Sequence, residues 1–151
     1  MPAGVHMRVE GGGGSPHILI LWPYHLDPVA EVFPIRVPDH YAEICLRGMA
    51  TAIPALGAYV ERMPKAFIDG GYYTKTRENR ALAGPLPIGG AFVHGALSGF
   101  GLMASSATAE LVAGHITGSP LPTYAAAFHP GRYDDPEYVA KIEGWVDSTQ
   151  L

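Results

Sequence analysis

The feature that most constrains this chain is an abrupt change of pattern between residues 91 and 118. The apolar run AFVHGAL (91–97) predicts a strand, and the small residues SGFG (98–101) follow it directly. A helical pattern then occupies 100–116, with Gly118 and Pro120 placed to end it. Glycines at such a join let another group come close to the backbone. A bound ligand and a tightly packed neighbouring sheet account for the pattern equally well.

A helix that begins at this join also has an electrostatic consequence. Its first N–H groups lack partners within the helix, and the helix dipole adds partial positive charge at that end. An anionic or electron-accepting group would be stabilised there. The letters GFGLMA (99–104) fit the looser dinucleotide pattern G-x-G-x-x-A. A Rossmann unit also needs a second strand and a later acidic residue, and SPLPTYAAAF (119–128) supplies no carboxylate, so this match alone is weak.

The other elements do not follow a regular order of strand, helix and strand. An antiparallel hairpin is predicted from strands at 4–10 and 17–22, and a helix is predicted from Asp39, as N-cap, to Pro54. Further segments are expected to be extended at 58–69, 71–76 and 81–84, with a loose turn and a short helix at 136–146 near the end. The predicted fold class is therefore α+β, with a mixed or antiparallel sheet and two main helices.

Composition excludes several classes of protein. The 151 residues carry a formal net charge of −4, and their basic residues are scattered, which argues against nucleic acid or an anionic membrane as partner. No apolar run has the length of a membrane span, and the N-terminal letters MPAGVHMRVEGGGG contain no apolar signal core. We therefore expect a cytoplasmic protein with no membrane partner.

Neither cysteine nor histidine usage indicates a metal site. The single Cys45 permits no internal disulfide and is expected to be a buried, inert thiol. The seven histidines show neither H-x-x-H nor H-E-x-x-H spacing, so no metal ligand is predicted. His94 precedes the glycine turn, and a hydrogen-bonded strand histidine is expected there. Asp134 and Asp135 are expected in a solvated turn.

Several long segments carry a resemblance to a known family. They are DHYAEICLRGMATAIPALG (39–57), GGYYTKTRENRALAGPL (70–86), GAFVHGALSGFGLMASSATAELVAGHITG (90–118) and PLPTYAAAFHPGRYDD (120–135). In this order and spacing they resemble the C-terminal part of FAD-dependent oxidoreductases of the D-amino-acid oxidase, glycine oxidase and sarcosine oxidase superfamily. The segments match, in turn, a helix, a strand and turn, the closing strand with its glycine turn and long helix, and the tail of that family.

The resemblance implies an organisation and a cofactor site. Residues 1–84 would be part of a substrate domain, and residues 85–151 would supply the flavin-facing strand, helix and tail. The backbone of the glycine turn would lie at the pyrimidine end of FAD, where negative charge develops when the flavin is reduced. The implied cofactor-binding residues are Leu97, Ser98, Gly99, Phe100, Gly101, Leu102 and Met103.

The resemblance also implies a reaction. Hydride would pass to the flavin from a C–N bond of a small-molecule amine or amino acid. Tyr73 is the implied catalytic residue, because the matching family tyrosine faces the substrate; an ordinary half-buried strand tyrosine is the other interpretation. Lys75 and Arg80 are further polar candidates, expected as a solvated residue and a turn residue.

Some positions depart from the family pattern. Gly71 stands where monomeric sarcosine oxidases carry the cysteine that binds flavin covalently, so FAD would be held noncovalently. Phe100 stands where histidine is frequent, and Met103 where a basic residue is frequent, which weakens the case for an amino-acid carboxylate as ligand. The family's N-terminal G-x-G-x-x-G unit is not found in this sequence. A separate N-terminal FAD-binding chain is therefore an expected partner.

Two other hypotheses remain open at this point. The first is a catalytically inactive fragment or an interaction module whose small-residue helix packs on another protein. The second is a small nucleotide-binding domain, which predicts a strand at 121–128 parallel to 91–97. The flavin hypothesis instead predicts that 91–97 lies beside 71–76 or 81–84, with Gly99 and Gly101 left uncovered by the chain's own side chains.

Overall fold

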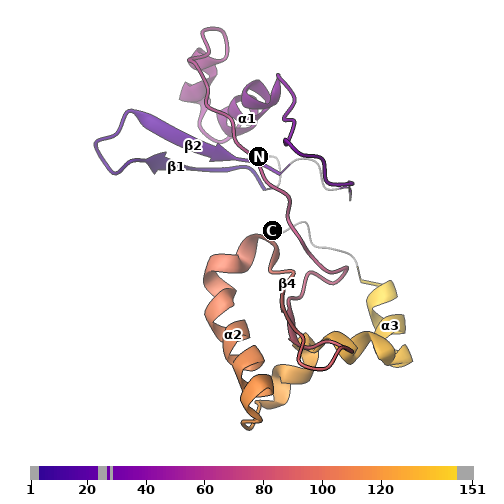
Figure 1. The fold of residues 1–151 in the computed structure, drawn as a ribbon. Coiled ribbons are helices and arrows are strands. Elements are labelled where there is room, and N and C mark those ends of the chain that lie inside the picture. The colour runs from indigo at the N-terminus through magenta and orange to yellow at the C-terminus, as the bar shows by residue number, and fades with distance from the viewer. Residues whose placement is uncertain (1–3, 24–26, 28, 146–151) are drawn as a thin grey trace. The chain divides into compact units, whose positions relative to one another are not determined.

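The computed structural model describes residues 4–23, 27 and 29–145, and it divides into two compact units, Met1–Tyr72 and Tyr73–Leu151 (Figure 1). Each unit contains a two-stranded antiparallel sheet and at least one helix. The α+β class is therefore confirmed. Within the described residues, the strands form two separate hairpins rather than one sheet. The boundary predicted after residue 84 lies within a strand of the second unit.

The first unit begins with the predicted hairpin. Strand β1, His6–Glu10, pairs antiparallel with strand β2, His17–Leu21 (Figure 1). In this register Glu10 lies opposite His17. The turn between them contains Gly11 and Gly12, both with φ near +90°, a conformation that favours glycine. A hairpin alone is marginally stable in water, so this one needs an apolar partner.

Helix α1, Tyr41–Ala50, packs on β2 and supplies that partner. Its buried face carries Cys45, Leu46 and Met49. The prediction that Asp39 caps this helix was wrong, because the N-cap position belongs to His40 and no side chain caps the helix there. The helix also ends before Pro54, which instead begins the 3₁₀ helix η1, Pro54–Tyr59, where its missing N–H is not needed.

The strand predicted at 58–69 is not formed. Residues 58 and 59 belong to η1, and no strand follows before β3. Pro64 lacks a backbone donor, and a strand requires a partner edge that the described residues do not provide here. The end of this unit is held by Tyr72, whose hydroxyl accepts from the N–H of Val32 at 2.9 Å and lies 3.2 Å from the carbonyl oxygen of the same residue.

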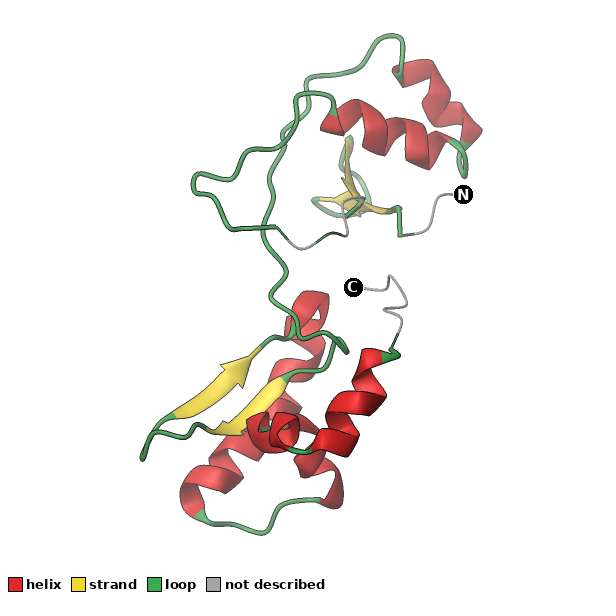
Figure 2. Cartoon of the chain, turned by 90° about the vertical axis from the view of Figure 1, so that its right-hand side faces the viewer, coloured by secondary structure: helices red, strands yellow, loops and turns green. Residues whose placement is uncertain are grey.

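The second unit is built around another hairpin. Strand β3, Leu82–Pro85, pairs antiparallel with strand β4, Phe92–Gly95, which confirms the expected pairing of 91–97 with 81–84. Helix α2, Gly101–Thr117, packs against both strands, and Figure 2 shows the helices of this unit gathered beside the hairpin. Gly118 ends α2 with φ +71°, as predicted. The small core consists of Ala83, Leu111 and Ala125.

The tail of this unit is helical. It forms 3₁₀ helix η3, Thr123–Phe128, 3₁₀ helix η4, Pro130–Asp134, and helix α3, Pro136–Glu143. The predicted helix at 136–146 is thus present, although residue 146 lies outside the described residues. Asp135 is not a simple solvated turn residue, because its carboxylate accepts from the N–H of Glu137 and caps α3. The strand at 121–128 that a nucleotide-binding domain would need is absent from this described segment.

A buried ion pair connects this tail to the start of the unit. The Arg132 guanidinium donates to Glu78 Oε1 at 3.0 and 2.7 Å, and both side chains are almost fully buried. The hydroxyl of Tyr138 donates to the same oxygen at 2.9 Å, and the hydroxyl of Tyr133 lies 3.0 Å from it. Arg132 also donates to the carbonyl of Arg80 at 3.1 Å. We call Glu78, Arg132, Tyr133 and Tyr138 the carboxylate clasp.

The clasp changes the acidity of its carboxyl group. Burial would raise the pKa of Glu78, but the hydrogen bonds from its own backbone, Arg132, Tyr138 and Tyr133 outweigh burial and lower that pKa to about 2. Glu78 therefore stays ionised across the whole physiological range. The same burial, with hydrogen bonding to Glu78, raises the pKa values of Tyr133 and Tyr138.

We expect Gly48→Ala to destabilise the first unit. A Cβ at Gly48 would lie 2.6 Å from Cζ3 of Trp22, an atom of a rigid ring. Overpacking of this kind costs about 1–3 kcal/mol, and better helix propensity offsets at most about 1 kcal/mol of it. Urea unfolding measures the loss. Gly57→Ala is the control, because nothing lies within 4 Å of its Cβ position; equal stability of the two variants would contradict the contact.

We expect the second unit to lose stability in strong acid. The folded pKa of Glu78 is about 2 and its usual value is 4.5, so this contribution is complete above about pH 4.5 and is lost as the pH falls through 2. The full contribution is on the order of 3 kcal/mol. Urea unfolding from pH 6 to pH 2 measures it, and Glu78→Gln should flatten this part of the profile. An unchanged profile in that variant would contradict the assignment.

Candidate functional site

The glycine turn follows strand β4 through an unusual run of backbone conformations. Ala96 and Ser98 both have φ +53°, and Leu97 between them has φ −80°. Residues Ser98–Phe100 form the single 3₁₀ turn η2, and α2 begins at Gly101. A left-handed conformation costs a non-glycine residue roughly 1–2 kcal/mol. Strain at two positions of one short turn persists only where surrounding contacts impose it.

Those contacts come from the extended segment that precedes β3. The N–H of Ser98 donates to the carbonyl of Thr74 at 3.1 Å, and Lys75 pairs antiparallel with Leu97 as an isolated bridge. Thr74 and Lys75 are thus beside the turn, as the flavin hypothesis predicts for their segment. The Oγ of Ser98 is buried and has no hydrogen-bond partner among the described residues. A buried hydroxyl without a partner is costly, so this atom is a second sign of strain in the turn.

A second constraint fixes α2 against β4. Nε2 of His94 lies 2.7 Å from Oγ1 of Thr108, whose hydroxyl also lies 2.9 Å from the carbonyl oxygen of Ala104. A carbonyl can only accept, so the hydroxyl donates to Ala104 and His94 donates to the hydroxyl. His94 is therefore the hydrogen-bonded strand histidine that was expected, and it fixes the helix beside the turn.

The turn itself is open. Gly99 is exposed, and a Cβ built on Gly101 would meet nothing in the described chain nearer than Cβ of Leu97, at 4.0 Å. The apolar residues around these glycines are also uncovered: Leu102 is 96% exposed and Met103 is 75% exposed. The space beside the glycines of this turn is thus not occupied by other side chains of the unit. This excludes the interpretation that the glycines serve only to pack the helix on its own sheet.

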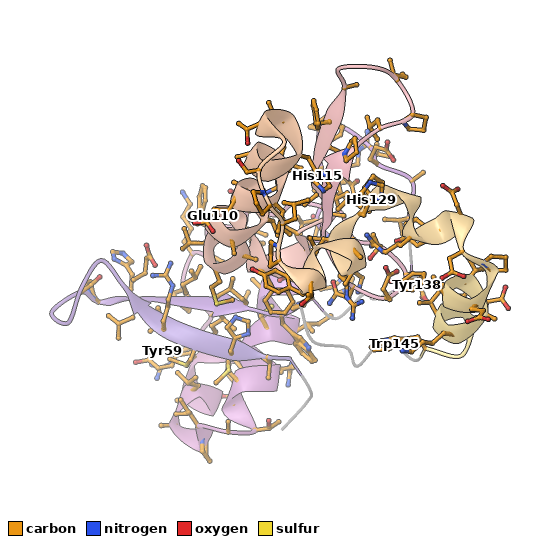
Figure 3. All side chains as sticks on the ribbon, turned by 90° about the horizontal axis from the view of Figure 1, so that it is seen from below. Tyr59, Glu110, His115, His129, Tyr138 and Trp145 are labelled. Atoms are coloured by element: carbon orange, nitrogen blue, oxygen red, sulfur yellow. The ribbon has the colours of Figure 1, made fainter. Side chains whose placement is uncertain are left out.

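The partial positive charge at the start of α2 is not balanced by a capping or acidic side chain of that helix. Its N-cap is Phe100, no side chain caps the first N–H groups, and the first turn contains no acidic residue. These N–H groups and the helix dipole favour a negative group at this end. The only side chain of α2 with a full charge at neutral pH is Glu110, which is exposed in the middle of the helix (Figure 3).

The structure brings the predicted residues together to different degrees. Residues 97–103 form one continuous stretch of chain, made of the turn η2 with its flanking Leu97 and the first three residues of α2. Tyr73 precedes the segment bonded to Ser98 and is 46% exposed. Lys75 is exposed, whereas Arg80 lies in a turn whose backbone is bonded to the hydroxyl of Thr76.

Two groups of residues were not anticipated from the sequence. They are the carboxylate clasp and the neighbouring side chains of His115 and His129, whose ring centroids lie 5.5 Å apart. No motif signals either group, because each joins residues that are distant in sequence. Cys45 lies in the other unit and is buried as predicted, and burial raises the pKa of its thiol, so it is a poor nucleophile.

The described residues show neither a metal site nor a membrane-spanning helix. Among the described residues, no three His, Cys, Asp or Glu side chains gather as they would around a metal ion; His25 lies outside those residues. No helix in the described ranges has both the length and the apolar character needed to cross a bilayer. Neither a family model, nor a curated protein, nor a solved structure matches this chain.

We expect Ala96→Gly and Ser98→Gly each to stabilise the second unit. Glycine removes the left-handed strain, about 1–2 kcal/mol, and loses about 0.5–1 kcal/mol in backbone entropy, for a net gain of roughly 0.5–1 kcal/mol. Urea unfolding measures the gain. Ala104→Gly, at a right-handed helical position, is the matched control and should cost about 1 kcal/mol. Destabilisation by all three changes would show that the turn is not strained.

Proposed function

We propose that residues 97–103 form the flavin-facing part of an FAD-dependent oxidoreductase that oxidises a C–N bond. One observation carries the proposal: the strained, uncovered glycine turn leads into a helix N-terminus that has neither a cap nor an acidic neighbour. The residues fit a planar, electron-accepting group. Gly99 and Gly101 leave room for it at the backbone, and the first N–H groups of α2 supply hydrogen-bond donors.

The chemistry follows from this placement. When bound, the flavin would accept hydride from the substrate carbon, and the resulting negative charge would fall near N1 and the C2 carbonyl. The N–H groups at the start of α2 and the dipole of that helix would stabilise this charge. Noncovalent binding is part of the proposal, since no cysteine is present in the turn or at Gly71.

The substrate side rests on fewer residues. The phenol of Tyr73, close in the chain to the segment bonded to Ser98, is the candidate for orienting the substrate nitrogen. Neither Phe100 nor Met103 can pair with a carboxylate, so a simple amine fits this turn better than an amino acid. A second candidate function, an interaction module, is favoured by the exposure of Leu102 and Met103. Both proposals would hold if a separate FAD-binding chain covered Leu102 and Met103 and carried the flavin to the turn.

The proposal predicts that this chain binds the flavin ring rather than the nucleotide end of FAD. Titration of the purified chain with FAD and with riboflavin, followed by flavin fluorescence, should give equal affinities within about threefold, in the range weaker than about 1 μM. Gly101→Val should weaken both at least about tenfold and leave the unfolding free energy within about 1 kcal/mol, because the Cβ position is open.

Gly89→Val is the matched control for this test, because nothing lies within 4 Å of its Cβ position and it is outside the turn. It should leave flavin binding unchanged. Absence of binding up to about 1 mM flavin would contradict the proposal for this chain, as would equal loss of binding in both variants.

A further inference from the structure

The C-terminal end of α2 carries a pair of histidines that plays no part in the proposed flavin site. His115 lies in the last turn of α2, and His129 lies between η3 and η4 (Figure 3). Their ring centroids are 5.5 Å apart, with the planes inclined at 59°. Gly84 of β3 lies against both: a Cβ there would be 3.3 Å from Cδ2 of His129 and 3.4 Å from Nε2 of His115. The pair therefore joins α2, β3 and the tail.

The hydrogen bonds determine where the protons lie. Nδ1 of His129 accepts from the N–H of Gly131 at 2.9 Å, so this nitrogen carries no proton in the structure. Nε2 of His115 is buried and has no hydrogen-bond partner among the described residues. Burial lowers the pKa of His115, and charge repulsion from a protonated His129 would lower it further. The C-terminal dipole of α2 favours the cation, but burial outweighs it.

The surroundings offer a proton on His115 no counter-ion. The titratable groups on the elements around the pair are Glu110 of α2, His94 of β4, Tyr124 of η3, and Arg132, Tyr133 and Asp134 of η4. Of these, only Arg132 shares with His115 and His129 the lining of an open pocket of about 480 Å³. Its charge is positive, and its Glu78 partner is already engaged in the carboxylate clasp. Asp134 is exposed.

We propose that protonation of His115 opens a local latch, releasing residues 119–131 from α2 and β3 while the carboxylate clasp holds the rest of the tail. A cation at Nε2 would be buried without a hydrogen-bond partner, and moving the segment away lets water solvate it. Opening separates Leu121, Ala125 and Phe128, all in this segment, from Ala83 and Leu111, the other two residues of the small core. The device therefore exposes an apolar surface in response to acid.

The direction of the pH dependence follows from the neutral form being favoured in the closed state. The latch is closed above the usual histidine pKa of 6.5 and opens as the pH falls from there through the lowered pKa of folded His115. Glu78, with its pKa of about 2, remains ionised throughout, so the clasp does not open with it. Local opening and acid unfolding of the unit thus occur in different pH ranges.

Amide hydrogen exchange on the full chain tests the proposal. Between pH 7.5 and pH 5.5, after correction for intrinsic exchange rates, protection within 119–131 should fall by a factor of about three or more. Protection within α3, 136–143, should be unchanged. His115→Phe keeps a ring of similar size and should abolish the pH dependence, whereas His17→Gln, on exposed β2, should retain it.

A direct titration of the histidine ring signals of the unmodified chain by NMR makes the test independent of how the variants fold. His115 should titrate below 6.5. A His115 pKa at or above 6.5, constant protection of 119–131 across the pH range, or a pH dependence that survives His115→Phe in a folded variant would each overturn the proposal.

Discussion

The second unit depends on one buried ion pair. Glu78 and Arg132 are 54 residues apart in sequence, and their contact joins the segment before β3 to the tail after η3. Removing one partner from such a pair is costly, because it leaves the other charge buried without compensation. With so small an apolar core, this specific contact determines where the tail lies more sharply than hydrophobic burial can.

The strained turn is possible because contacts on several sides fix it. The bond from Ser98 to Thr74 holds its backbone, and the bond from His94 to Thr108 holds the start of the helix that follows. Two specific polar contacts thus fix the segment whose backbone is least favourable, as is common where a protein positions a ligand.

The second unit is folded, but the apolar start of α2 has no covering group within the described residues. Leu102 and Met103 are largely exposed beside the open glycines, at the end of α2 opposite to the His115 latch. Exposing an apolar surface of this kind to water costs free energy, and that cost falls when a ligand or a partner covers the surface. Both proposed functions share this physical origin, and they differ in whether flavin or another chain makes the contact.

Local patterns were sufficient for elements whose signals lie within a few residues. Alternation predicted β1 and β2, and helical periodicity followed by Gly118 and Pro120 predicted α2, because such preferences act over one or two turns of chain. The turn within 97–103 was likewise predictable, because small residues follow an apolar run directly in the sequence. The strand expected at 58–69 failed because a strand also needs an edge to pair with. The carboxylate clasp and the histidine pair depend on residues far apart in sequence meeting in space, and no local preference encodes such a meeting. Only the tertiary structure decided whether another part of the chain covers Gly101.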